Sequence, residues 1–260
     1  MNVSTHTPDG WSALRRYTAA RVALGRAGGS LPTDEVIRFA IAHAAARDAV
    51  HTPLDVESLQ RDITHLQMPY LVLATMAADR ATYLQQPDLG RTLDGDSRGA
   101  LAARTEKGAD VVLIVADGLS APAAQRQATP VLAGLVPALW RDGLRIAPLC
   151  IVRHARVAVE DEIGAALGAK AAVILLGERP GLGAADSLGA YLVFDPRPGR
   201  TDAQRNCVSN IRPGGLSAAE AADTLHYLIS EALRRRLSGV MLKDDREKPL
   251  VPPANGVLPQ

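Results

Sequence analysis

From about residue 109 onward, short, largely uncharged runs alternate with longer segments of helical periodicity. The runs are too short for typical helices and predict strands at 110–116, 146–152, 171–176, 190–194 and 206–211, of which 110–116 and 171–176 are expected to be buried. Helical segments lie between some of them, at 121–140 and 159–167, and a capping box at Ser217 and Glu220 begins an amphipathic helix that extends to about Leu237. This alternation predicts right-handed βαβ units and a Rossmann-like open, mostly parallel sheet with flanking helices.

The first hundred residues follow a different pattern. They predict a mainly helical N-terminal region, residues 1–100, ahead of an α/β domain at 101–242. Helical spacing is found at 11–24, 33–50 and 55–66. The run Tyr70–Leu73 fits either an isolated strand or the start of another helix. The segment 243–260 is charged and proline-rich, which predicts a disordered tail.

Composition narrows the class of protein. The 260 residues are 47% hydrophobic, enough for a substantial core, and the net charge of +1 gives no reason to expect nucleic acid or a membrane surface as a partner. Two cysteines, Cys150 and Cys207, offer no disulfide framework and favour a reduced, cytoplasmic setting. Residues 1–10 lack the apolar segment of a secretory signal, and no apolar run approaches the length of a membrane span.

A glycine-rich loop follows the run 171–176 and marks the candidate site. Its sequence from Gly177 is GERPGLG, and ligands of α/β proteins bind just past such strand ends. A dinucleotide-binding loop is one alternative, but Asp186 occupies the position of the third glycine of that fingerprint, where a carboxylate would face a pyrophosphate. The sequence has no P-loop motif, no G-x-S-x-G motif and no metal-ligand spacing.

Two further interpretations stay open from the residues alone. One is a free-standing nucleotide-binding α/β enzyme with Asp117, Glu178 and Asp195 around a pocket, which would bind its ligand without a partner. The other is a scaffold that contacts a partner protein and no ligand. Replacing Glu178 by alanine separates them, because only a ligand-binding role for this carboxylate predicts weaker ligand binding.

Four segments, in this order, resemble the small (light) subunit of ethanolamine ammonia-lyase, and the resemblance extends from about Tyr17 to Met241. They are PDLGR at 87–91, VEDEIGAALGAK at 159–170, GERPGLG at 177–183 and RNCVSNIRPGG at 205–215. The resemblance implies a carbon–nitrogen lyase that depends on adenosylcobalamin and converts ethanolamine to acetaldehyde and ammonia by a radical mechanism. It leaves the role of PDLGR open.

The resemblance also implies two kinds of subunit. A separate large subunit with a TIM barrel would hold the substrate and the radical chemistry, while this chain, inactive alone, would help to bind cobalamin. The family assembles as a trimer of heterodimer pairs, and the same hetero-oligomer is expected here. The expected location is the cytoplasm, either free or within a bacterial microcompartment.

Three residues match the positions at which the family's small subunit contacts cobalamin: Val157, Glu178 and Cys207. Each lies at or just beyond the C-terminal end of a predicted strand, so we expect them to gather at one edge of the sheet. Glu178 would accept hydrogen bonds from corrin amides, while Val157 and Cys207 would act through main chain or side chain. The sequence has no D-x-H motif, so this chain is not expected to supply a lower ligand to cobalt.

Overall fold

The computed structural model describes residues 6–7, 9–18 and 20–246. Six strands form its main sheet: β3 (Tyr70–Ala74), β4 (Val111–Ala116), β5 (Leu149–Arg153), β6 (Ala171–Gly177), β7 (Leu188–Phe194) and β8 (Arg205–Ile211). Their order is β3-β5-β4-β6-β7-β8; the first four are parallel, and β7 is antiparallel to both of its neighbours. The predicted Rossmann-like, mostly parallel sheet with flanking helices is confirmed.

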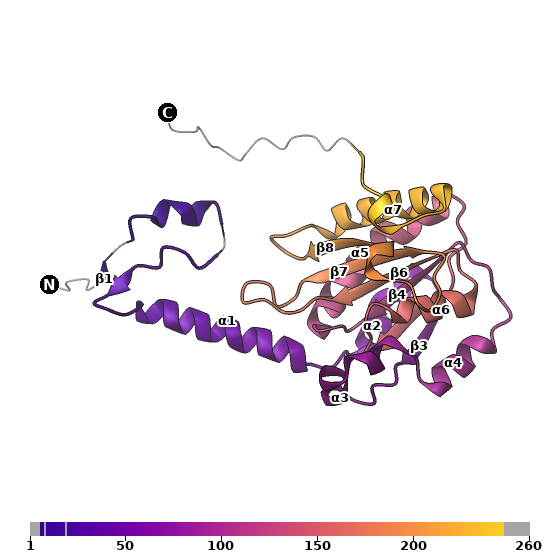
Figure 1. Ribbon diagram of the computed structural model, residues 1–260, viewed down its shortest axis with the longest axis horizontal. Helices are drawn as coiled ribbons and strands as arrows, with labels where there is room; N and C mark the ends of the chain where they lie inside the picture. The colour runs from indigo at the N-terminus through magenta and orange to yellow at the C-terminus, as the bar shows by residue number, and fades with distance from the viewer. Residues whose placement is uncertain (1–5, 8, 19, 247–260) are drawn as a thin grey trace.

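Helices cover both faces of the sheet, which gives three layers (Figure 1). On one face lie α5 (Ala121–Arg141), α7 (Ala218–Arg235) and α2 (Val56–Ile63); on the other lie α6 (Val159–Leu167) and α4 (Gly95–Ala102). Alternate residues of β4 enter the two cores, and every one of them is fully buried. Burial on both faces explains why this strand reads as one uncharged run.

Two of the predicted helices show how local signals and packing combine. The capping box of α7 is present, with Ser217 and Glu220 bonded to each other's backbone N–H groups. Pro130 and Pro137, which we expected to kink or split α5, do not split it. An internal proline removes one backbone hydrogen bond, but the face of α5 that includes Leu132 is completely buried, and helices in proteins owe most of their stability to such packing.

The N-terminal segment extends from this body as an arm (Figure 1). Its main element is α1 (Thr33–His51), and β1 (His6–Thr7) pairs with β2 (Arg26–Ala27) beyond it. The predicted helix at 11–24 is wrong, because only the short 3-10 helix η1 (Ser12–Arg16) forms there. None of its residues is buried.

The remaining elements connect the arm to the sheet. The run that began at Tyr70 is the strand β3, which forms one edge of the main sheet although it comes from the region predicted as helical. Short helices complete the described chain: η2 (Thr64–Leu66), α3 (Arg80–Gln85), η3 (Pro87–Arg91), η4 (Asp202–Gln204) and η5 (Gly239–Met241). Within the described residues, no helix has the length and apolar character needed to cross a membrane. The predicted disordered tail lies outside the described residues from 247 onward.

Candidate functional site

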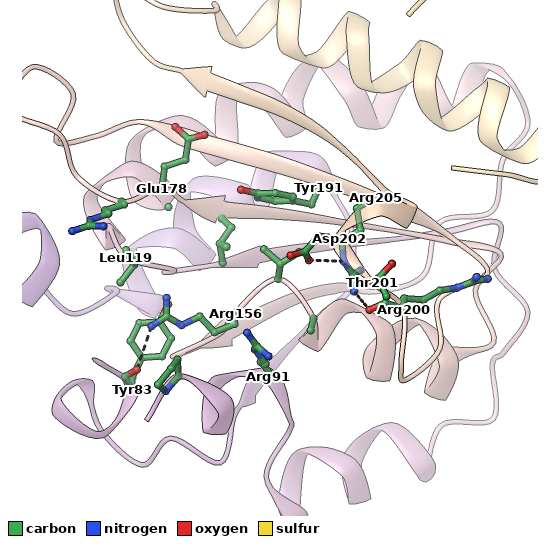
Figure 2. A pocket seen from close by; sticks show the side chains of 16 residues that line it. Tyr83, Arg91, Leu119, Arg156, Glu178, Tyr191, Arg200, Thr201, Asp202 and Arg205 are labelled. Atoms are coloured by element: carbon green, nitrogen blue, oxygen red, sulfur yellow. Dashed lines mark hydrogen bonds and ion pairs between the residues drawn. The ribbon is translucent and has the colours of Figure 1, made fainter. Parts of the chain in front are cut away.

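A cavity of about 780 Å³ lies beside the carboxyl ends of three parallel strands (Figure 2). Leu119 follows β4, Val157 follows β5 and Glu178 follows β6, and all three line it. The cavity continues over Tyr191 of β7, on the face of the sheet that α6 covers elsewhere. Ligands of open α/β sheets bind at such a place, so the cavity is the candidate site.

Close approach of two backbone segments shapes the floor of the cavity. The N–H of Leu119 donates to the carbonyl of Gly177 at 2.9 Å. A Cβ on Gly177 would lie 2.0 Å from the carbonyl oxygen of Ser120, so only glycine fits. This explains one of the glycines in GERPGLG: it lets the loop after β4 pack directly on the end of β6.

A buried carboxylate holds the loop that carries Val157. Asp117, at the end of β4, accepts the N–H of His154 at 3.0 Å and that of Ala155 at 3.2 Å. Burial raises the pKa of Asp117, and the guanidinium of Arg80 at 3.5 Å opposes that shift. His154 has a φ of 57°, and these two bonds hold the loop through that unfavourable conformation.

The PDLGR segment forms η3 and supports the same loop from the other side. The carbonyl of Gly90 accepts the N–H of Arg156 at 2.7 Å. A Cβ on Gly90 would lie 2.9 Å from the carbonyl oxygen of His154 and 3.0 Å from the ring of Tyr83. Tyr83 is fully buried, donates to the carbonyl of Ala155 at 3.1 Å and lies under the guanidinium of Arg156, 4.2 Å from the ring centre.

Glu178 has a fixed carboxylate that lines the cavity. The hydroxyl of Ser187 donates to its Oε2 at 2.6 Å, and the N–H of Asn210 in β8 approaches its Oε1 at 3.4 Å. An ionised carboxylate offers about four lone-pair positions, so it can accept further hydrogen bonds from a ligand. The structure therefore places Val157 and Glu178 on one cavity.

Cys207 takes a different position from the one expected. It is the third residue of β8 and pairs with Tyr191, so it does not lie at a strand end. Directly opposed residues share a face of the sheet, so Cys207 is on the face of Tyr191. It does not line the main cavity but a separate hollow of about 270 Å³, which is lined mainly by residues of β8 and α7. Burial raises the pKa of its thiol, partly offset by a hydrogen bond with Tyr191.

Several arginines that were not among the candidate residues line the cavity: Arg91, Arg156, Arg179, Arg200 and Arg205. The sequence carried a signal for Arg156 and Arg200, because arginines recur just after the runs 146–152 and 190–194. Arg205 is buried against Glu160 and Asp161, and Arg200 pairs with Asp195. Within the described chain, Arg156 and Arg179 have no such carboxylate partner, so this side of the cavity favours an anionic group.

The alternative site is not assembled in the structure. Asp117 is buried and committed to the backbone, and Asp195 follows β7 at the opposite end of the sheet from Glu178. Gly181 and Gly183 lie in the connection between β6 and β7, where no helix begins that could receive a pyrophosphate. Among the described residues, no three His, Cys, Asp or Glu side chains lie together as a metal site.

By its fold and its cavity, the chain is an α/β protein with a ligand-sized site beside the carboxyl ends of parallel strands. The family model for the ethanolamine ammonia-lyase light chain matches residues 8–243, which is most of the sequence. The chain belongs to this family.

Relatives named ethanolamine ammonia-lyase small subunit agree with that assignment. The one from Ralstonia nicotianae is 52% identical over 251 residues, covering 95% of this chain and 93% of the relative. The one from Azotobacter vinelandii is 53% identical over 247 residues, covering 94% and 92%. The one from Pseudomonas fluorescens Pf-5 is 50% identical over 246 residues, covering 94% and 90%.

Proposed function

We propose that this chain is the cobalamin-contacting subunit of an ethanolamine ammonia-lyase, which converts ethanolamine to acetaldehyde and ammonia. The observation that carries the proposal is that Val157 and Glu178 line the same cavity. They are two of the three residues that match the family's cofactor contacts. Cys207 is included through its pairing with Tyr191, whose ring lines the same cavity.

The residues present fit such a cofactor. Cobalamin has carboxamide side chains around the corrin ring and one phosphate in its nucleotide loop, so it needs scattered polar partners on a broad surface. Glu178 can accept N–H bonds, and the backbone N–H of Val157 has no protein acceptor within the described chain. The positive charge of Arg156 and Arg179 suits the phosphate.

The proposed role is to bind and orient, and no residue of this chain is assigned to catalysis. When bound, adenosylcobalamin supplies the carbon-centred radical that starts the reaction. The substrate and the radical chemistry belong to a large subunit with a TIM barrel, which this chain meets across the cofactor. The proposed assembly is a trimer of heterodimer pairs in the cytoplasm, free or within a bacterial microcompartment.

The first experiment measures ammonia release from ethanolamine and adenosylcobalamin by this chain, by its cognate large subunit, and by the mixture. We expect activity in the mixture alone. An inactive mixture that forms no complex would contradict the proposal, and so would activity of this chain by itself, which would favour the free-standing enzyme.

The second experiment tests the site through cofactor affinity. We expect Glu178→Ala to weaken cyanocobalamin binding by the assembled complex by about 1.5–3 kcal/mol, the usual loss for a hydrogen bond to a charged group. Glu106→Ala is the matched control, because Glu106 is 82% exposed and precedes β4, at the opposite end of the sheet. Equal affinities of the two variants would remove Glu178 from the site.

A further inference from the structure

Residues outside the proposed cofactor contacts hold the carboxylate of Glu178 in place. Ser187 precedes β7, is 5% exposed, and donates its hydroxyl to Oε2 of Glu178 at 2.6 Å. Its carbonyl also accepts the N–H of Glu178 at 2.9 Å. Both the backbone and the side chain of Glu178 are therefore fixed by one buried residue.

A missing side chain on the next strand makes room for the same carboxylate. Gly189 lies in β7, opposite Leu176 of β6. A Cβ on Gly189 would lie 3.0 Å from Oε1 of Glu178, 3.2 Å from its Cγ and 3.3 Å from the ring of Tyr191. Most real Cβ atoms have no contacts this close, so a larger residue would push the carboxylate or the ring out of place.

We propose that Ser187 and Gly189 are positioning residues, which place the Glu178 carboxylate over β7 so that its remaining lone pairs face the cofactor. The inference rests on the proposed function, since it assigns a purpose to a contact between Glu178 and cobalamin. The Ser187 hydroxyl holds Oε2 of Glu178, and the missing side chain of Gly189 leaves space for Oε1.

The physical reason is preorganisation. A glutamate side chain has three rotatable bonds, and holding it still costs conformational entropy. In this structure a hydrogen bond inside the β6–β7 connection already orders the side chain in the folded protein. Cofactor binding therefore does not have to lose this conformational entropy. Without the Ser187 hydroxyl, the carboxylate would keep, among the described residues, only the long contact from the N–H of Asn210, at 3.4 Å, before the cofactor binds.

The test is a double-mutant cycle on cyanocobalamin affinity, measured by the absorbance change on binding to the assembled two-subunit complex. We expect Ser187→Ala to weaken binding about tenfold, since the Glu178 carboxylate loses the hydrogen bond that orients it. In the Glu178→Ala background, Ser187→Ala should change the affinity by less than about twofold, because the group that it positions is gone. Ser58→Ala, on α2, is the matched control.

Gly189→Ala provides a second, independent variant in the same cycle. It keeps the Ser187 hydroxyl and displaces the carboxylate, so it should also weaken binding in the wild-type background and lose its effect with Glu178→Ala. If Ser187→Ala prevents assembly, the result for Gly189→Ala decides the question.

Three alternative results would contradict the inference, and they can be told apart. Weaker binding that persists unchanged in the Glu178→Ala background would show that Ser187 and Gly189 act on the fold in general, and the inference fails. Wild-type affinity in both single variants, with weak binding by Glu178→Ala, would also refute it while leaving the proposed function intact. Wild-type affinity of Glu178→Ala would overturn the cofactor contact itself, and the positioning role with it.

Discussion

The buried ion cluster beside the cavity makes the sharpest prediction about stability. Arg205, at the start of β8, is 2% exposed and reaches two carboxylates at the start of α6. It lies 2.5 Å from Glu160, which is completely buried, and 2.6 Å from Asp161, which is 4% exposed. Arg205→Met removes the only partner that could balance two buried negative charges within the described chain.

The expected loss is about 3–5 kcal/mol in the free energy of unfolding, the usual cost of breaking a buried ion pair from one side. Methionine has a similar length and keeps the packing of the side-chain stem, so the loss reports charge more than volume. The three hydrogen bonds that Arg205 donates here to the carboxylates are not additive, since they share one guanidinium.

The loss should depend on pH in a defined direction. Burial raises the pKa of Glu160 well above its ordinary value, and Arg205 opposes that shift. For an acid whose pKa is raised by folding, the stabilisation is complete below the unfolded pKa and is lost as pH rises through the folded pKa. Without Arg205 the folded pKa rises further, so the deficit of Arg205→Met should be larger at pH 8 than at pH 5.

Urea denaturation of the chain at pH 5 and pH 8 measures both effects. The control is Arg234→Met, which should leave stability close to wild type because Arg234 is exposed and Glu231 keeps Arg235 as a partner. Adding Glu160→Gln to Arg205→Met should recover part of the loss at pH 8, because one buried charge is removed. A loss below about 1 kcal/mol, or one that is equal at the two pH values, would refute the reasoning.

Two more predictions concern the floor of the cavity and the cysteines. Gly177→Ala should lower the free energy of unfolding by at least about 2 kcal/mol, since its Cβ would overlap the carbonyl of Ser120. Gly183→Ala is the control and should leave the free energy of unfolding unchanged, because open space surrounds that position. Urea denaturation of the two variants measures the difference. Burial raises the pKa of Cys150 to about 12, so a disulfide reagent at pH 8 should modify exposed Cys207 first. Peptide mass spectrometry measures the order of labelling, and rapid labelling of Cys150 would contradict its burial.

Much of the fold follows from the sequence because its strands are buried on both faces. The runs at 111–116 and 171–176 could be predicted as strands since every residue in them is enclosed by helices. The helix Val159–Leu167 also matched, because acidic residues begin it and Gly168, with a φ of 62°, ends it. The segment 11–24 was predicted as one helix, but among its described residues only the short 3-10 helix Ser12–Arg16 forms.

The candidate site was predicted only in part, for a reason that concerns strand direction. Cys207 was expected at or just beyond the C-terminal end of a strand, although it is the second residue of the run predicted at 206–211. Arg205 pairs with Val193 and thereby extends β8 at its start, which places Cys207 inside the strand beside Tyr191. Uncharged runs predict that strands exist, but they do not fix register across a sheet, which depends on the partner strand.

The supports of the site could not be found from the sequence at all, because they join residues that are distant along the chain. PDLGR shows this most clearly: the sequence left its role open, because that role depends on Gly90 meeting the loop at His154–Arg156. Since Gly90 binds the backbone of Arg156, the residue before Val157, a shift of η3 would move a proposed cofactor contact. The helical region and the sheet therefore meet at the cavity: η3 is bonded to the β5–α6 loop, and the segment after β4 is bonded both to that loop and to the end of β6.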